Sequence, residues 1–232
     1  MGDERNSDRH VDVELTQGVV RGSRDEGILR FLGVPYAAPP ERFELPRSPS
    51  RSEGIREALL PGDCAPHRIT PFPGLDVVPL VGQGGLGGRD YLTLNVWAPD
   101  GGSELPVMVF VHGGGFVIGS KDAAAQDGSA FARSGVICVS VNYRLGIDGF
   151  LPVPGAPTNL GLRDILFALR WVQDNIAAFG GHPGNLTVFG ESAGAMAIAD
   201  LITSPLAKGL FRRAIVQSGH GSMVRENRVA QR

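Results

Sequence analysis

Ser192 lies at the centre of the most specific local pattern in the chain. Residues Gly190–Gly194 read Gly-Glu-Ser-Ala-Gly, which fits the pattern Gly-x-Ser-x-Gly. A strand-like run precedes the pattern and a segment rich in small residues follows it, so we expect a sharp strand-to-helix turn with an exposed hydroxyl. Glycines on both sides let the backbone pack closely around that strained serine. The pattern predicts a nucleophile for acyl transfer; the alternative is a glycine-rich turn with a bystander serine.

A run of three glycines, Gly113–Gly115, follows an apolar strand-like run and begins directly after His112. Such a backbone can turn several N–H groups toward one point, as the oxyanion of a tetrahedral intermediate requires. The amide of Ala193, beside the serine, is a further donor. The two motifs together predict an oxyanion hole, although a glycine run alone is also typical of a flexible loop. We interpret His112 as a structural residue that orients this loop.

A serine nucleophile needs an imidazole to take its proton and a carboxylate to orient that imidazole. After Ser192 the sequence contains one histidine, His220, and the acidic residues Asp200 and Glu226. Asp200 falls two turns into the predicted helix, so we expect it to point away from the active face. His220 follows a predicted strand and is a candidate base; the simpler interpretation is a loop histidine. No convincing acid–histidine pair is visible.

Alternating and continuous apolar runs predict the elements that must position these residues. Apolar residues at helical spacing predict a helix over Leu162–Phe179, which the pair Gly180-Gly181 ends. A second helix is predicted over Ala193–Thr203. The predicted strands are Val11–Leu15 and Val19–Gly22 (a β-hairpin), Ile28–Pro35, Leu92–Trp97, Pro106–Val111, Val136–Val141, Leu186–Phe189 and Arg213–Gln217.

Alternating strands and helices predict an α/β fold with a mostly parallel, doubly wound sheet behind an N-terminal β-hairpin. Residues 1–10 are polar, so we expect a disordered tail. Residues 11–232 then form a single domain. The long stretch Pro39–Gly88, rich in proline, glycine and charge, is either a functional surface loop or the least ordered part of the molecule.

Composition excludes several function classes. The net charge of −2 gives no basic field for nucleic acid or an anionic membrane. The longest apolar runs reach about six residues, whereas a membrane helix needs roughly 20. The N-terminus lacks the apolar core of a secretory signal. Two cysteines, Cys64 and Cys138, make no disulfide framework, so a cytoplasmic protein is expected.

Seven segments in order carry a resemblance to a known family. With these segments the chain, from about Val11 to Gly219, resembles the N-terminal part of type B carboxylesterases, the cholinesterase-like branch of the α/β-hydrolase fold. The segments are Gly33–Ala37, Asp90–Val96, His112–Phe116, Asn142–Gly146, Ala168–Ile176, Phe189–Gly194 and Gln217–Gly219.

The resemblance implies hydrolysis of carboxylic esters through a covalent acyl-serine on Ser192. It implies that Gly114, Gly115 and Ala193 supply the N–H groups of the oxyanion hole. It also implies that no metal or organic cofactor is needed and that the partner is a small-molecule ester. The acyl and alcohol preferences do not transfer.

Several positions depart from the family pattern. Tyr91 stands where a cysteine often pairs with the position matched by Cys64, so that disulfide cannot form, in agreement with a reducing compartment. Arg89 replaces an acidic residue, so a common salt bridge is lost. His182 replaces an aspartate and is interpreted as a turn residue. Arg144, by contrast, lies within the matching segment Asn142–Gly146, and it is expected to pair with a carboxylate that braces its loop.

Family members are much longer, and their catalytic acid and histidine lie in the C-terminal half that this chain lacks. We therefore expect a fold that is incomplete at its C-terminus: a truncated product, a fragmentary sequence or a degraded paralogue. Surfaces left uncovered would favour marginal stability or self-association. Two alternatives to esterase activity remain open, an inactive fragment and a non-catalytic binding protein on the same fold.

Overall fold

The computed structural model describes residues 9–70, 73–86 and 88–222. Its centre is a nine-stranded sheet in the order β1-β2-β3-β5-β7-β6-β8-β9, with β4 paired to β2. No described helix is both long and apolar enough to cross a membrane. The strands are β1 (His10–Leu15), β2 (Gly18–Asp25), β3 (Ile28–Pro35), β4 (Ile55–Glu57), β5 (Thr93–Pro99), β6 (Leu105–Val111), β7 (Ile137–Val141), β8 (Gly181–Glu191) and β9 (Arg213–Gln217).

The N-terminal half of the sheet is antiparallel, and this corrects the expectation of a mostly parallel sheet. β1 pairs with β2, β2 with β3, β3 with β5, and β5 with β7, all antiparallel. A two-residue turn joins β2 to β3, and its residues Glu26 and Gly27 have φ of 47° and 75°. Positive φ at both positions suits a tight hairpin, which forces neighbouring strands to run in opposite directions. We call β1, β2, β3 and β5 the antiparallel half.

The other half is parallel, as expected. β6 lies between β7 and β8, and β8 pairs with β9, all in parallel. We call β7, β6, β8 and β9 the parallel half. All five residues of β7 are buried, as is typical of a strand covered on both faces. β8 begins five residues before the predicted Leu186, because Gly181 already pairs with Leu105 ahead of an irregularity in the ladder.

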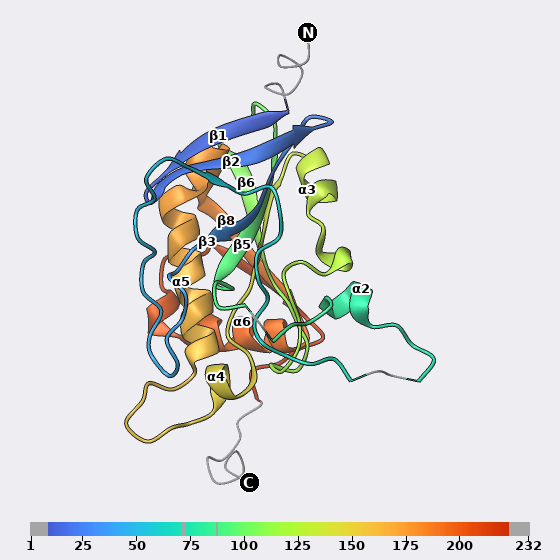
Figure 1. The fold of residues 1–232 in the computed structure, drawn as a ribbon, viewed down its shortest axis with the longest axis vertical. Coiled ribbons are helices and arrows are strands. Elements are labelled where there is room, and N and C mark those ends of the chain that lie inside the picture. The colour runs from blue at the N-terminus through green and yellow to red at the C-terminus, as the bar shows by residue number, and fades with distance from the viewer. Residues whose placement is uncertain (1–8, 71–72, 87, 223–232) are drawn as a thin grey trace.

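Helices cover both faces of the sheet, and Figure 1 shows α5 and α3 on opposite sides of the strands. α3 packs on the face that carries Trp97, Cys138 and Phe189. α5 and α6 contribute to the larger core on the other face. The helices are α2 (Val78–Val81), α3 (Ser129–Arg133), α4 (Gly146–Phe150), α5 (Leu160–Asn175) and α6 (Ala193–Thr203), with 3₁₀ turns η1 (Ala124–Gln126), η2 (Ile176–Phe179) and η3 (Pro205–Ala207).

The predicted helix over Leu162–Phe179 is two pieces, α5 and then η2. Gly180, with φ of 85°, ends the second piece, because glycine adopts this left-handed conformation without steric cost. The predicted range of α6 is confirmed in full. Residues 1–8 of the predicted tail lie outside the described residues, while His10 already belongs to β1. The irregular stretch over Pro39–Gly88 contains β4 and α2 among its described residues.

Candidate active site

Ser192 occupies the single residue between β8 and α6. Its backbone has φ of 54° and ψ of −119°, a conformation that non-glycine residues rarely adopt. Its amide donates to the carbonyl of Gln217 at the end of β9 (2.9 Å), so the neighbouring strand helps to hold the turn. Backbone strain of this kind costs about 1–3 kcal/mol and concentrates at functional sites. The sharp turn expected from the sequence is present.

Glycines surround this turn because the backbones approach too closely for a side chain. A Cβ added to Gly190 would lie 2.8 Å from the carbonyl oxygen of Val111. A Cβ on Gly194 would meet the same oxygen, and one on Gly219 would lie 3.0 Å from the backbone carbonyl oxygen of Ser192. The ends of β6, β8 and β9 are thereby drawn together at one edge of the sheet.

The glycine loop after β6 lies directly against the serine turn. A Cβ on Gly113 would lie 3.2 Å from the Cβ of Ser192. Gly114 and Gly115 have φ of 105° and 62°. Their amides donate no hydrogen bond to another described residue. Ala193 is the first residue of α6, so its amide is one of the donors that a helix leaves unpaired at its N-terminus. The structure thus places the start of the glycine loop, at Gly113, and the first residue of α6, Ala193, directly beside the predicted nucleophile.

His112 is buried behind this loop rather than exposed to a substrate. Its ring stacks on Tyr143 with centroids 4.5 Å apart, and its Nδ1 lies 2.9 Å from the carbonyl oxygen of Gly113. The hydroxyl of Tyr143 donates to the carbonyl of His112 (2.8 Å). Burial lowers the pKa of His112 to about 4, so the ring is neutral near pH 7. These contacts agree with a structural role in orienting the loop.

Among the described residues, no acid–histidine pair hydrogen-bonds to Ser192. His220 is exposed beyond β9, and its Nδ1 lies 2.8 Å from the hydroxyl of Ser222. Neither His220 nor Asp200 hydrogen-bonds to Ser192 within the described chain. Asp200 is exposed on α6, where partial desolvation raises the pKa of its carboxyl. Glu226 lies outside the described residues.

Arg144 has the predicted carboxylate partner. Its guanidinium bonds to both oxygens of Asp164 on α5, the shorter contact being 2.6 Å, and both side chains are 1% exposed or less. A third contact joins Arg144 to the carbonyl of Glu44 (2.6 Å). This pair ties the loop after β7 to the helix that covers the sheet.

The residues that depart from the family pattern all lie in the described part of the structure. Cys64 and Cys138 are free thiols. Tyr91 is buried, and Arg89 is exposed. His182 is exposed near the start of β8, where its Nδ1 accepts the amide of Gly184 (3.1 Å).

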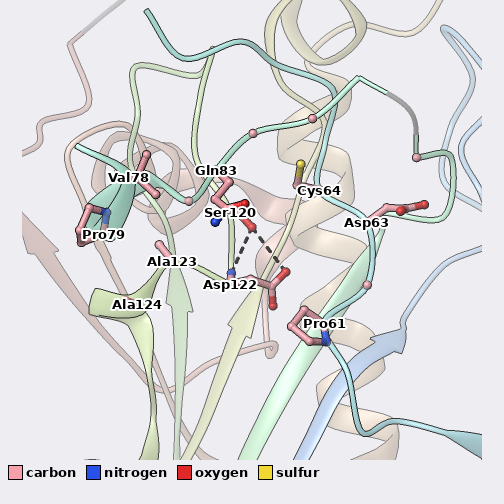
Figure 2. Close-up of a pocket in the computed structure, with 15 residues that line it drawn as sticks. Pro61, Asp63, Cys64, Val78, Pro79, Gln83, Ser120, Asp122, Ala123 and Ala124 are labelled. Carbon is pink, nitrogen blue, oxygen red and sulfur yellow. Dashed lines mark hydrogen bonds between the residues drawn. The ribbon is translucent and has the colours of Figure 1, made fainter. Parts of the chain in front are cut away.

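A pocket of about 710 Å³ is lined in part by Ser120, Asp122 and Ala123, which follow the glycine loop (Figure 2). Its walls come from residues 61–64, 78–79, 82–85, 88, 120 and 122–124, and Cys64, Ser120 and Asp122 supply polar groups. Ser192 and the oxyanion glycines do not line it. In the described parts of the chain, no group of three or more histidine, cysteine or acidic side chains is arranged to hold a metal ion.

An ion pair between a buried lysine and a partly buried aspartate close to this site was not predicted from the sequence. Lys121 and Asp122 follow the glycine loop, and the Lys121 side chain is fully buried with its Nζ 2.6 Å from an Asp122 oxygen. Two adjacent charges of opposite sign are common on protein surfaces, so the sequence held no signal for burial.

Comparisons with known proteins identify the family of the chain. The family model described as "Carboxylesterase family" matches residues 8–229. Para-nitrobenzyl esterase of Bacillus subtilis (strain 168) is 44% identical over 219 residues, which cover 90% of this chain and 44% of that relative. Phenmedipham hydrolase of Pseudarthrobacter oxydans is 43% identical over 214 residues, covering 89% of this chain and 42% of that relative.

A solved structure of a PNB esterase superposes with a TM-score of 0.86 at 40% identity, covering 96% of this chain and 47% of that one. Its fold is that of an α/β-hydrolase, as expected from the sequence. The chain spans less than half the length of the curated relatives it matches. The chain belongs to the carboxylesterase family, a family of carboxylic ester hydrolases.

Proposed function

We propose that this chain carries the nucleophile and the oxyanion hole of a carboxylic ester hydrolase, with Ser192 as the nucleophile. The observation that carries the proposal is the strained Ser192 backbone directly against a glycine loop in which the amides of Gly114 and Gly115 donate to no other described residue. Gly114, Gly115 and Ala193 are the proposed oxyanion donors. Membership of an ester-hydrolysing family supports the same reaction class.

The proposed reaction has two steps. The Ser192 oxygen attacks the ester carbonyl carbon while a base takes the hydroxyl proton, and the carbonyl oxygen gains negative charge next to the amide donors. The bond to the alcohol oxygen then breaks and the alcohol leaves with that proton, so the acyl group remains on Ser192. In the second step water attacks the acyl carbon while the base takes one of its protons, the bond from that carbon to the Ser192 oxygen breaks, the acid leaves, and the base returns the proton to Ser192. In each step one bond to the acyl carbon forms and another breaks, so no oxidant or reductant is needed.

His220 is the candidate base for this chain by itself. It follows β9, whose end already contacts the Ser192 amide through Gln217. In the described structure its ring faces Ser222 instead of the serine turn. To act as base it would have to leave Ser222, so its contribution requires a change of rotamer or a second copy of the chain.

Turnover of para-nitrophenyl acetate by the purified 232-residue chain tests the proposal. Three variants are compared with the parent: Ser192→Ala, His220→Gln, and the exposed Ser103→Ala as a matched control. We expect Ser192→Ala to reduce turnover to background and Ser103→Ala to leave it unchanged. Intact-mass spectrometry of the quenched reaction should show one acetyl group on the parent and none on Ser192→Ala.

Background rates in the parent as well as in Ser192→Ala would overturn the proposal for this chain. The second candidate function is a catalytically inactive fragment or a binding protein on the same fold, and one observation favours it. Within the described residues the Ser192 side chain makes no hydrogen bond to a histidine or carboxylate. Loss of turnover in His220→Gln, with folding intact, would instead assign the base within the chain.

Self-association is part of the same proposal. β9 is the last strand in the sheet order, and Ile215 and Val216 on it are 44% and 37% exposed. An unprotected apolar edge strand is a template for pairing with a second copy. Sedimentation analysis should show dimers or larger species that Val216→Lys suppresses; a parent chain that sediments as a monomer would refute the association.

We also propose that the protein works in a reducing compartment, the cytoplasm. The free thiols of Cys64 and Cys138 support this location. Fractionation of the source cells, followed by detection with an antibody, is the direct test. Recovery in a membrane or secreted fraction would contradict it.

A further inference from the structure

A buried lysine stands at the C-terminal end of the glycine loop. The Lys121 side chain is 0% exposed, and its ammonium bonds to both oxygens of Asp122, at 2.6 and 2.7 Å. Burial lowers the pKa of Lys121, and the Asp122 carboxylate opposes that shift. Removing two charges from water costs as much as their attraction returns, so such a pair is weak evidence for stability. Its position therefore calls for another explanation.

Three side chains from neighbouring strands tether this pair. The amide of Lys121 donates to Oδ1 of Asn142, just beyond β7 (2.8 Å), and the hydroxyl of Ser140 on β7 donates to the carbonyl of Lys121 (3.0 Å). Asn95 on β5 donates to Oδ1 of Asp122 (2.7 Å). Figure 2 shows Asp122 next to Ser120, whose hydroxyl accepts a hydrogen bond from the Asp122 amide (3.1 Å). The end of the loop is thus fixed to the centre of the sheet.

The loop needs such fixing because its own residues do not define its shape. Gly114, Gly115, Phe116 and Gly119 all have positive φ, between 62° and 121°. Glycine has little torsional preference, so the conformation must be imposed from the two ends of the loop. At the first end, Tyr143 holds the carbonyl of His112 (2.8 Å).

The two ends of the loop touch each other beside the serine. A Cβ on Gly119 would meet the His112 ring and would lie 2.6 Å from the carbonyl oxygen of Gly113. Gly113 in turn lies against Ser192. A shift at Lys121, two residues beyond Gly119, therefore reaches the serine turn through packed backbone.

We propose that Lys121 and Asp122, held by Asn95, Ser140 and Asn142, are positioning residues that set the conformation of the loop over 112–119. The proposal rests on the proposed function only in making Gly114 and Gly115 of that loop the oxyanion donors. These charged residues act through the loop backbone and do not touch the substrate.

Amide hydrogen exchange of the full chain, measured by NMR, gives the rate at which the loop over 112–119 opens. The measurement does not require enzymatic activity. The amides of Val117 and Ile118 both bond to the carbonyl of Gly114 (3.1 Å each), so they report loop opening. In Ser140→Ala we expect their exchange to accelerate about tenfold, the effect of losing one buried hydrogen bond. Exchange of Val139 in the middle of β7 should stay unchanged.

Two further variants sharpen the test. Thr93→Val is the matched control, because the buried Thr93 hydroxyl has no partner within the described structure. It should leave loop exchange at the parent rate. The double variant Lys121→Met/Asp122→Asn removes both charges together, so no unpaired buried charge remains, and it should accelerate loop exchange at least as much as Ser140→Ala.

Equal acceleration in the loop and in β7 would show a merely structural contribution and overturn the proposal. Unchanged loop exchange in Ser140→Ala and in the double variant would overturn it as well. Where the parent hydrolyses para-nitrophenyl acetate, kcat should fall about tenfold in Ser140→Ala with KM unchanged. If loop exchange accelerates in these variants but the parent chain shows no turnover, the positioning of the loop by Lys121 and Asp122 is supported and the catalytic role of the loop is refuted.

Discussion

The antiparallel and parallel halves of the sheet place their charges and their strain differently. In the antiparallel half, Arg21 of β2 pairs with Asp12 of β1 at 2.7 Å, and both side chains are about one-third exposed. Beyond the parallel half, Arg144 and Asp164 form a pair that is almost completely buried. The positive-φ residues of the antiparallel half lie in hairpin turns or at a bulge, whereas those of the parallel half include Ser192 itself.

This difference separates what builds the fold from what builds the site. Regular hairpins satisfy their own backbone and tolerate charge on the surface. The carboxyl edge of the parallel half instead holds strained backbone, crowded glycines and buried ions. These features persist only where many contacts from the surrounding structure hold them in place. Substitutions at this edge should therefore have larger effects than equivalent changes in the antiparallel half.

The largest expected effect is at the buried pair. Arg144→Met leaves the Asp164 carboxylate buried without its partner, so we expect a loss of about 3–5 kcal/mol in the free energy of unfolding. Asp12→Asn, at the exposed pair, should leave the urea midpoint unchanged within error. Urea titrations followed by circular dichroism compare the two, and equal shifts would contradict the contrast between the halves.

The second effect depends on pH. His112 has a folded pKa of about 4 against an ordinary value of 6.5. Between pH 4 and pH 6.5 this histidine binds a proton in the unfolded chain but not in the folded chain. Its contribution therefore makes the free energy of unfolding fall as the pH drops from 6.5 to 4. The full loss is about 3 kcal/mol. His112→Asn should flatten this part of the stability profile, and parallel profiles for parent and variant would refute the assignment.

The third effect is steric. A Cβ at Gly194 would run into the carbonyl oxygen of Val111, so Gly194→Ala should cost about 1–3 kcal/mol. Gly221→Ala is the control, because its Cβ would meet its nearest neighbour at an ordinary 3.5 Å. Thermal melts of the two variants give the comparison. An unchanged melt for Gly194→Ala would mean that the serine turn relaxes more easily than its packing indicates.

The smallest effect isolates the strain at the serine. Ser192→Gly should be more stable than Ser192→Ala by about 1 kcal/mol, because glycine accepts φ of 54° without a steric penalty. Both variants lack the hydroxyl, so the loss of that group does not contribute to the difference. Urea midpoints in the reverse order would show that the turn stores no strain.

Much of the fold was predictable because its signals are local. The ranges of β3, β9 and α6 agree with the predictions residue for residue. The sharp turn at Ser192 followed from glycines on both sides, and the partner of Arg144 was expected as a carboxylate. The direction of β5 was not predictable, since an apolar strand looks the same whether its neighbours run parallel or antiparallel.

The sequence by itself indicated the sharp serine turn and the glycine loop, because crowded positions such as Gly114, Gly190 and Gly194 have no room for a Cβ and their glycines are visible in the sequence. The tertiary structure alone decided which charges are buried. Lys121 and Asp122 are adjacent in the sequence, yet Asn95 and Ser140 reach them only after distant strands become neighbours in the sheet. Burial and hydrogen-bond partners depend on what packs from elsewhere in the chain, and no local pattern encodes that.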